Sequence, residues 1–301
     1  MKHFNRSSVA GATALAVAAF LTIAGSASNA SLIDPDLAAV EQGGYAILGL
    51  QGAQIDLSSG PLVVNGNIGV GAGATLNANG GGHINGTIFA DATATVNNSD
   101  PVTGGIVQPS SGPAQAQAAA LNLASLAASL APTQSFSQIN TAQTINATTG
   151  LNVIAVGMGG INLSGGALVL NGTASQQFVL NIAGQSSLSG GSKIQVTGGL
   201  LPQNVVFNFT GTSGQFQTSS GNNATVGVFL APNELIHLNG PNPGSGVDVS
   251  EFISGVGINA QSNTQFQALP PPSVPETNTL LPLLLVLGAA VGGPYMRRAL
   301  A

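Results

Sequence analysis

Apolar and polar residues alternate in short runs over most of residues 45–269, and Gly or Asn separates one run from the next. In residues 178–182 and 205–209 the alternate positions are Phe, Leu, Ile or Val, with Asn181 and Asn208 on the opposite side. A period of two is typical of a strand with one buried face. Five Asn-Gly pairs mark corners that we expect to need a positive φ. These pairs begin at Asn65, Asn79, Asn85, Asn171 and Asn239.

The strands belong to a repeat of about 25 residues. Residues 162–184 and 187–211 each contain Leu-Ser-Gly-Gly, a short strand, a Gly corner and a second apolar strand, and residues 56–66 align with the first half of this unit. Such periods are typical of stacked units that bury their cores against one another. The pattern predicts a mainly β fold, a right-handed parallel β-solenoid. A β-sandwich of hairpins is the alternative, because Asn-Gly pairs also favour hairpins.

One segment departs from the strand pattern. Residues 113–131 are rich in Ala, follow Ser110 and Ser111, carry a Pro in the first turn and stop at Pro132. These signals predict one long α-helix. Leucines at helical spacing form a stripe, and no second helix is predicted to cover it, so we expect the helix to pack along a side of the solenoid. The stripe consists of Leu123, Leu126 and Leu130.

The two ends of the chain predict export and membrane insertion. Residues 1–30 have a basic start, an apolar stretch and small residues, the order of a secretory signal peptide. Residues 279–301 form an apolar run closed by Arg297 and Arg298, which is typical of a membrane helix with a cytoplasmic basic end. The Pro-rich residues 270–278 separate this tail from the domain at residues 31–269. We therefore expect a signal helix and a C-terminal membrane helix in addition to the solenoid.

Composition excludes several classes of partner. Only 5% of residues are charged, and Lys193 is the single basic residue between residues 31 and 269. Nucleic-acid binding requires Lys and Arg to neutralise phosphates, so we expect no nucleic-acid partner. The chain has no Cys, and therefore neither a disulfide nor a thiolate metal site can form.

The candidates for catalysis are few, and none forms a known constellation. His83 lies in a Gly-rich segment, and His237 follows Glu234 by three residues in a run that looks like a strand, where the two would face opposite sides. Asp248 and Glu251 match no known calcium loop. We therefore expect neither an enzyme nor a cofactor nor a metal site.

Ice is the most specific ligand hypothesis. Ice binding needs a flat, regular face of small hydroxyl or methyl groups, and a solenoid can offer such a face. Threonines supply such groups, although Thr is also simply a good strand residue. The candidate residues for an ice-binding face are Thr75, Thr87, Thr93 and Thr95. A neutral glycan is the other candidate ligand, but the domain lacks Trp and has Tyr45 as its one tyrosine.

The C-terminal tail resembles a known sorting signal. Val274, Pro275 and Glu276, a spacer, the apolar helix and the terminal arginines are similar to the PEP-CTERM tail. The resemblance implies a Gram-negative bacterium, an exosortase-type sorting enzyme as partner, transient anchoring in the inner membrane, and release at the cell surface. Thr277 stands where the pattern has its second proline, a departure that bears on cleavage more than on membrane targeting.

The middle of the chain resembles two secreted β-solenoid families. YAILGL at 45–50, the segments at 60–76 and 86–94, and the helix are similar to the ice-binding-like domain. LNVIAV at 151–156 through VFLAPN at 228–233 is similar to the choice-of-anchor A domain. The choice-of-anchor A family implies no activity. Because the domain is expected to be exported and carries little chemistry, we predict a structural or adhesive element of the cell surface or its exopolysaccharide matrix, with an ice- or glycan-binding module as the alternative.

Overall fold

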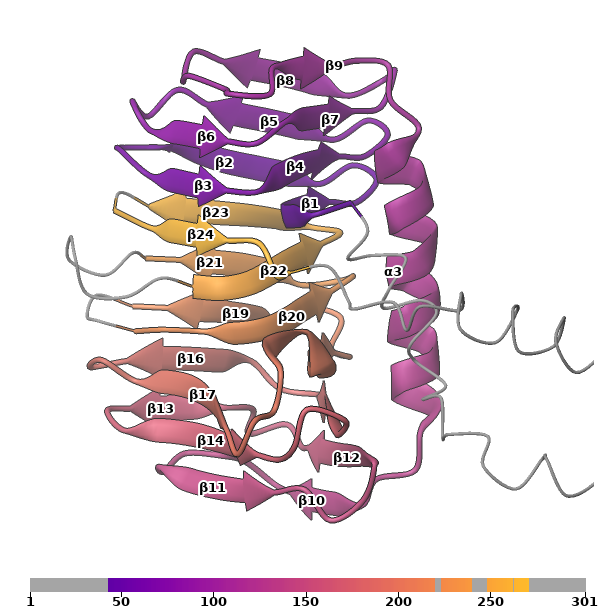
Figure 1. The fold of residues 1–301 in the computed structure, drawn as a ribbon, viewed down its shortest axis with the longest axis vertical. Coiled ribbons are helices and arrows are strands. Elements are labelled where there is room, and N and C mark those ends of the chain that lie inside the picture. Colours follow the sequence, from indigo (N-terminus) through magenta and orange to yellow (C-terminus); the bar gives the residue numbers. More distant parts are fainter. Residues whose placement is uncertain (1–42, 220–222, 240–247, 262, 271–301) are drawn as a thin grey trace, which may run out of the picture.

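A computed structural model describes residues 43–219, 223–239, 248–261 and 263–270. These residues form a stack of coils with one long helix along its side (Figure 1). Every strand ladder in the described ranges is parallel, for example between β1 and β4, β2 and β5, and β14 and β17. A sandwich of hairpins would need antiparallel neighbours. The predicted parallel β-solenoid with one helix is therefore confirmed.

Each complete coil has three faces. The first is the helix face, whose strands follow one another along the stack. They are β10 (Gln134–Phe136), β12 (Leu151–Val156), β15 (Gln177–Ile182), β18 (Val205–Phe209), β20 (Val226–Ala231), β22 (Asp248–Ser254), β1 (Tyr45–Gly49), β4 (Asn67–Val70), β7 (Ile88–Ala90) and β9 (Ile106–Val107).

The second face, which we call the open face, is an eight-stranded sheet. Its strands are β13 (Asn162–Ser164), β16 (Ser186–Ser189), β19 (Gln215–Thr218), β21 (Leu235–Leu238), β23 (Gly257–Gln261), β2 (Gln54–Ser59), β5 (Thr75–Ala78) and β8 (Thr95–Asn98). The third face holds two ladders. They are β11 (Gln143–Asn146), β14 (Ala167–Asn171) and β17 (Lys193–Thr197), and β24 (Gln265–Gln267), β3 (Val63–Asn65) and β6 (His83–Asn85). A short 3-10 helix, η2 (Pro202–Asn204), precedes β18.

The order of the coils in space differs from their order in the chain. Residues 43–107 form the upper block in Figure 1, and the helix then carries the chain to the opposite end of the stack. Residues 133–267 form the lower block, which climbs back until its last coil meets the first coil of the upper block. At this join β22 pairs with β1, β23 with β2, and β24 with β3. The first coil of the chain therefore lies in the middle of the stack.

The repeat length varies along the stack. In the lower block Leu163 pairs with Leu188 and Asn162 with Ser187, which confirms the predicted offset of 25 residues. In the upper block Thr75 pairs with Thr95 and Asn77 with Asn97, an offset of 20 residues. The predicted repeat of about 25 residues is thus correct for the first coils of the lower block and too long for the upper block. Further along the lower block the offset is 30 residues between Ser187 and Gln217 and 20 residues between Gln217 and His237.

The four Asn-Gly pairs that lie wholly within the described residues are at corners, but a positive φ is not their general reason. Gly66 has a φ of 148°, whereas Gly80, Gly86 and Gly172 are not among the glycines with positive φ. A Cβ at Gly86 would instead collide with the backbone carbonyl of Gly66 in the coil beneath. The close stacking of corner on corner, rather than a turn conformation, requires glycine there.

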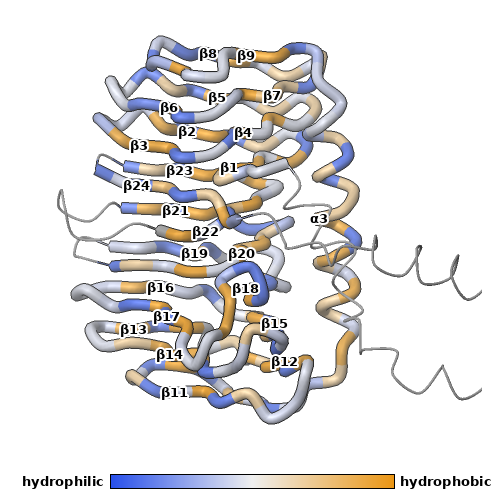
Figure 2. Tube along the Cα trace, viewed as in Figure 1, coloured by the Kyte–Doolittle hydropathy of each residue, from blue (hydrophilic) through white to orange (hydrophobic). Residues whose placement is uncertain are grey.

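The core is a set of columns, because each inward side chain stacks on its counterpart in the next coil. Phe207, Phe229 and Phe252 stack in this way, with ring centroids 4.6 Å and 5.2 Å apart. Figure 2 shows the short apolar and polar stretches that alternate along the strands. The longest inward column on the helix face runs through Gln134, Ile154, Leu180, Phe207, Phe229, Phe252, Ile47, Ile68, Ile88 and Ile106.

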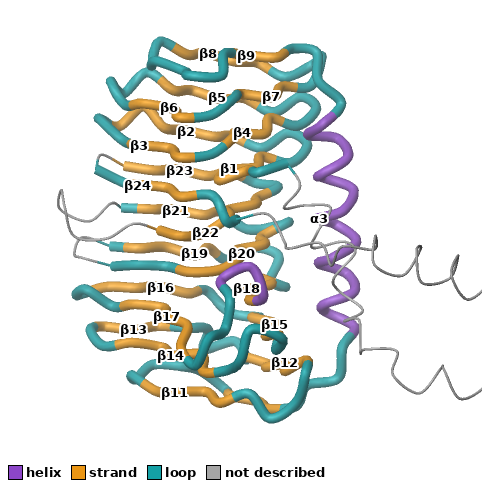
Figure 3. Tube along the Cα trace, in the orientation of Figure 1, coloured by secondary structure: helices purple, strands orange, loops and turns teal. Residues whose placement is uncertain are grey.

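The helix α3 (Gly112–Ser129) matches the predicted segment and packs against the helix face (Figure 3). Leu123 is buried, but Leu126 and Leu130 are only partly so, and alanines make up most of the remaining buried surface. Two amides from the solenoid reach the last turns of the helix. Asn181 Nδ2 donates to the Ala127 carbonyl at 2.7 Å, and Asn208 Nδ2 donates to the Ala124 carbonyl at 3.1 Å.

The predicted signal peptide, the sorting motif and the C-terminal membrane helix all lie outside the described residues. Within the described ranges, no helix combines the length and the apolar character needed to span a bilayer.

Candidate binding face

The open face carries a continuous column of outward polar side chains. Inward positions of its strands are mostly aliphatic or Phe, with Ser186, Thr218 and Asn98 as polar exceptions, so the period of two turns the intervening residues outward. One residue from each of the eight strands shares the column. In spatial order they are Asn162, Ser187, Gln217, His237, Asn259, Asp56, Asn77 and Asn97.

Two pairs of neighbours, one near each end of this column, hydrogen-bond to one another. Asn97 Nδ2 donates to Asn77 Oδ1 at 2.9 Å, and Ser187 Oγ donates to Asn162 Oδ1 at 2.9 Å. A side-chain amide or hydroxyl that uses one group along the column keeps its remaining capacity for a partner outside it. The column is therefore a row of polar side chains, mainly neutral amides and hydroxyls, repeated once per coil at about 4.8 Å.

The four threonines predicted for an ice-binding face do not lie together. Thr75 and Thr95 are register partners on β5 and β8 of the open face, next to the polar column. Thr93 lies in the corner before β8, where its hydroxyl donates to Asp91 Oδ1 at 2.8 Å and accepts from the Gly73 amide at 3.0 Å. Thr87 lies between β6 and β7, at the corner of the third and helix faces. Only one pair of the predicted set is thus presented on the open face.

Sequence reasoning missed the polar column as a unit. The signal was present in the upper block, where residues 65–78 and 85–98 repeat at an offset of 20 residues, including Asn77 with Asn97. In the lower block the column changes residue type at almost every coil, and no repeat of sequence reveals it.

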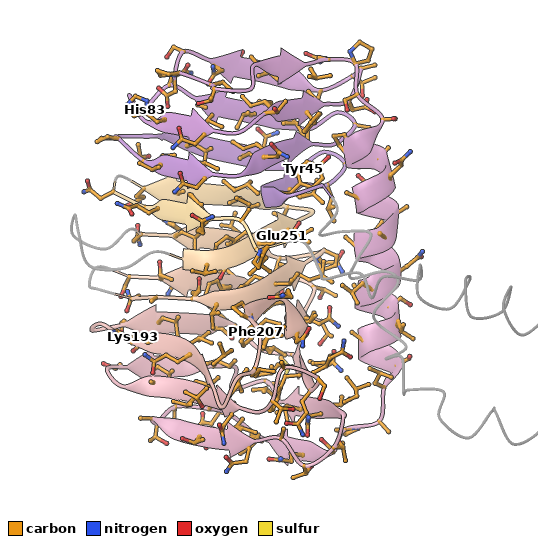
Figure 4. The ribbon with its side chains drawn as sticks, in the orientation of Figure 1. Tyr45, His83, Lys193, Phe207 and Glu251 are labelled. Carbon is orange, nitrogen blue, oxygen red and sulfur yellow. The ribbon has the colours of Figure 1, made fainter. Side chains whose placement is uncertain are left out.

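The third face carries shorter amide ladders and a small hollow. Asn85 Nδ2 donates to Asn65 Oδ1 at 2.9 Å, and Asn171 Nδ2 donates to Asn146 Oδ1 at 2.8 Å. A pocket of about 240 Å³ lies at the corner with the open face. His83 is the one titratable residue among those that line it, so the pocket offers no acid–base pair. Figure 4 shows His83 and Lys193 in different blocks, on the side away from α3.

Two buried carboxylates lie apart from both exposed faces. Glu234 is 1% exposed at the corner before β21, and burial raises the pKa of its carboxyl. His237 projects outward from β21, whereas Glu234 precedes the strand and is buried, so only His237 lies in the strand that the sequence predicted for both residues. Glu251 is buried in β22 (Figure 4), and burial together with the charge of Glu251 raises the pKa of Tyr45 to about 12. Among the described residues, no three His, Cys, Asp or Glu side chains are grouped to hold a metal ion.

Comparison with known proteins gives one family match. The model of a putative ice-binding-like adhesive domain matches residues 16–259, well over half of the chain. None of the curated proteins matches the sequence.

Several solved structures share the fold. An ice-binding protein from an Antarctic bacterium of the Flavobacteriaceae superposes with a TM-score of 0.56 at 18% identity, over 79% of this chain and 47% of that one. The chain thus spans about half the length of this bacterial protein. An ice-binding protein from the Antarctic ascomycete Antarctomyces psychrotrophicus gives 0.54 at 19% identity, over 78% and 98% of the two chains. One from an Arctic yeast gives 0.51 at 18% identity, over 79% and 98%.

Proposed function

Because the chain belongs to the family of putative ice-binding-like adhesive domains, we propose that it is a non-enzymatic adhesive solenoid that binds through its open face. The proposed ligand is a neutral, hydroxyl-rich polymer of the cell surface or its exopolysaccharide matrix. In this proposal the protein is exported and displayed outside a Gram-negative cell.

The polar column of the open face is the observation that carries the proposal. Eight polar side chains, six of them neutral amides or hydroxyls, cover about 34 Å of face at one per coil. Single amide or hydroxyl contacts with a ligand are each worth only about 1 kcal/mol. Their regular repetition on a rigid face lets many weak contacts act together on an extended ligand, as in multivalent binding. This kind of binding needs neither a deep pocket nor stacking aromatics.

The composition of the column favours a polymer over a small charged ligand. Its members are mainly amides and hydroxyls, with Asp56 and His237 as the titratable exceptions. Side-chain amides both donate and accept hydrogen bonds, which suits sugar hydroxyl groups of either orientation.

A substitution on the column tests the proposal. Asn77→Lys places a long charged side chain in the polar column of the open face, and we expect it to lower retention on insoluble host exopolysaccharide about tenfold, the equivalent of about 1.4 kcal/mol. Asn146→Lys is the matched control, because Asn146 holds the same kind of amide pair on the third face. Equal retention of both variants would show that the open face is not the binding surface.

Ice is the second candidate ligand, and the register pair of Thr75 and Thr95 on the open face favours it. Thermal hysteresis and ice shaping by the purified protein measure this activity directly. If the protein binds ice through this face, Thr95→Tyr should abolish ice shaping while the Asn146→Lys variant keeps it. Unaltered ice growth in the presence of the unmodified protein would remove this candidate.

Export and sorting form a separate part of the proposal and rest on the sequence of the two ends. We infer that residues 1–30 direct secretion, and that Val274, Pro275 and Glu276 with Arg297 and Arg298 direct transient anchoring and release by an exosortase-type enzyme. Localisation of the tagged protein in cells with and without the sorting enzyme tests it. Retention in the membrane in both strains would contradict the assignment of the tail.

A further inference from the structure

The coils at the two ends of the stack each have a neighbour on one side only. Within the described ranges, β9 pairs with β7 and β8 with β5 at the upper end, and β10 pairs with β12 and β11 with β14 at the lower end. Figure 1 shows these strands as the first and last rungs of the stack. Terminal strands leave a row of backbone N–H and C=O groups open to another strand.

The upper end exposes part of the core. Ile106 is the last member of the inward column that passes through Ile68 and Ile88, yet it is 48% exposed because no described coil lies above it. Its neighbour Val107 is 43% exposed. Val96 and Val102 pack against the core from the same rung and are only partly buried. The upper end is therefore an apolar surface, bordered by strand edges that have no further strand beside them in the described ranges.

The lower end continues the same columns. Gln134 stands at the foot of the column that Ile106 ends, and Phe136 lies beside it, partly buried against the core. On the third face the lower end begins with the amide pair of Asn146 and Asn171. The upper end finishes there with Asn85, to which the Thr103 hydroxyl is hydrogen-bonded at 3.5 Å. If one molecule stacks on another, the inward columns of the two molecules continue, with Ile106 of one against Gln134 of the next, and the amide ladder of the third face meets a hydroxyl.

Strand direction and charge both permit this stacking. All ladders are parallel, so the upper edge of one molecule and the lower edge of another are the two halves of a parallel ladder. The terminal strands have the sequences TVNN, IV, QSF and QTIN, and none contains Lys, Arg, Asp or Glu. Charged residues are a common protection of exposed edges, and these edges lack them.

The helix does not obstruct the ends. Its 18 residues extend about 27 Å, whereas ten stacked strands of the helix face extend about 43 Å. In Figure 1 the helix lies within the height of the stack.

The molecule already contains one junction of this kind. The upper block docks on the lower block through β1 with β22, β2 with β23 and β3 with β24, although these strands are far apart in the chain. The join shows that coils of this sequence stack on one another without a direct covalent connection between them.

From these observations we propose that the protein assembles head to tail with further copies of itself, the upper end of each copy stacking on the lower end of the next. The contact is heterologous and does not close, so repeated addition gives a rod. This inference goes beyond the proposed adhesive function, because it concerns the ends of the stack and not the open face.

The experiment uses the full chain and three single substitutions to Lys. Ile106→Lys places a charge on the upper end, and Gln134→Lys places one on the lower end. Val256→Lys is the matched control, because Val256 is also 48% exposed but lies in the middle of the stack, in the corner before β23. Circular dichroism and the melting temperature establish that each variant is folded. Light scattering after size exclusion, over concentrations up to the millimolar range, gives the mass.

We expect the mass of the unmodified protein and of Val256→Lys to rise with concentration, and electron microscopy to show rods of constant width. Each end variant alone should stay monomeric. Their mixture should stop at a one-to-one dimer, because only one pair of unmodified ends remains. A monomeric unmodified protein at all concentrations, or end variants that associate as strongly as the unmodified chain, would overturn the inference. Association through the apolar C-terminal tail would persist in both end variants, so this outcome is distinguishable from association through the ends of the stack.

Discussion

At the scale of single residues, Glu234 links the stability of the fold to pH. Its carboxylate is 1% exposed, and neither oxygen has a hydrogen-bond partner among the described residues. The carboxylate lies against the loop at Gly211 and Gly214, where a side chain larger than hydrogen would collide with it. Desolvation disfavours the charged form, which is why burial raises the pKa of this group.

The raised pKa gives a pH dependence of defined sign. The folded state holds the proton of Glu234 more tightly than the unfolded state does. Its contribution to stability is therefore fully present below the ordinary pKa of Glu and is lost as the pH rises through the raised value. We expect Glu234→Gln to increase the free energy of unfolding at neutral pH by about 1–3 kcal/mol, because a buried unsatisfied charge is removed. Urea unfolding of both proteins between acidic and neutral pH measures the difference.

Asp91→Asn is the control for this prediction. Hydrogen bonds from the Thr93 amide and hydroxyl lower the pKa of the Asp91 carboxyl, so its contribution has the opposite sign and is lost as the pH falls. A Glu234→Gln variant that keeps the pH slope of the unmodified protein would show that Glu234 is not the group responsible.

Residue positions were predictable where the period of two was visible. His237 lies in a strand as predicted and points outward, but Glu234 lies in the corner before that strand, where burial and not the period of two sets its surroundings. The pairing of Thr75 with Thr95 was missed, because the longer offset of the lower block was applied to an upper block with shorter coils. Coil length varies with the residues at the corners, and these corners contain Gly and Asn in both blocks.

At the scale of elements, the helix was predictable but its docking was not. Ala-rich composition and two flanking prolines marked its ends to within two residues. Its contact surface, however, is mainly alanine and one leucine, and two solenoid amides fix its C-terminal turns. A local pattern of leucines does not reveal amide contacts with strands that lie much later in the chain.

Removal of these amides should loosen the helix. Asn208 is buried, and its side chain bonds both the Ala124 carbonyl and Asn181 Oδ1. We expect Asn208→Ala to lower the free energy of unfolding by about 1–3 kcal/mol, because buried acceptors lose their donor.

The measurement is thermal unfolding together with hydrogen exchange of α3. Asn171→Ala is the matched control, since Asn171 makes similar amide bonds on the solvent side of the third face. If both variants lower the free energy of unfolding equally, the hydrogen bonds of Asn208 to the helix contribute no more than an exposed amide pair.

At the scale of the whole molecule, stability should be graded along the stack. A coil near the middle is paired on both sides, while the coils at β9 and β10 are paired on one side. Local opening costs least where few buried contacts must break. We expect backbone amides of β1, β20 and β22 to exchange slowest and those of β9 and β10 fastest, as measured by hydrogen exchange with mass spectrometry. Fast exchange at the join would instead indicate two blocks that open independently.

The join also sets the order in which the protein can fold. Ile47, near the start of the described chain, pairs with Phe252, near its end. During synthesis the N-terminus leaves the ribosome first. The strands β1, β2 and β3 then have no coil to pair with on their lower side until β22, β23 and β24 have been made. Pairings of such long sequence separation have a high contact order and form late. The solenoid therefore cannot be completed vectorially, coil after coil, and the last coil to be made is the one that closes the middle of the molecule.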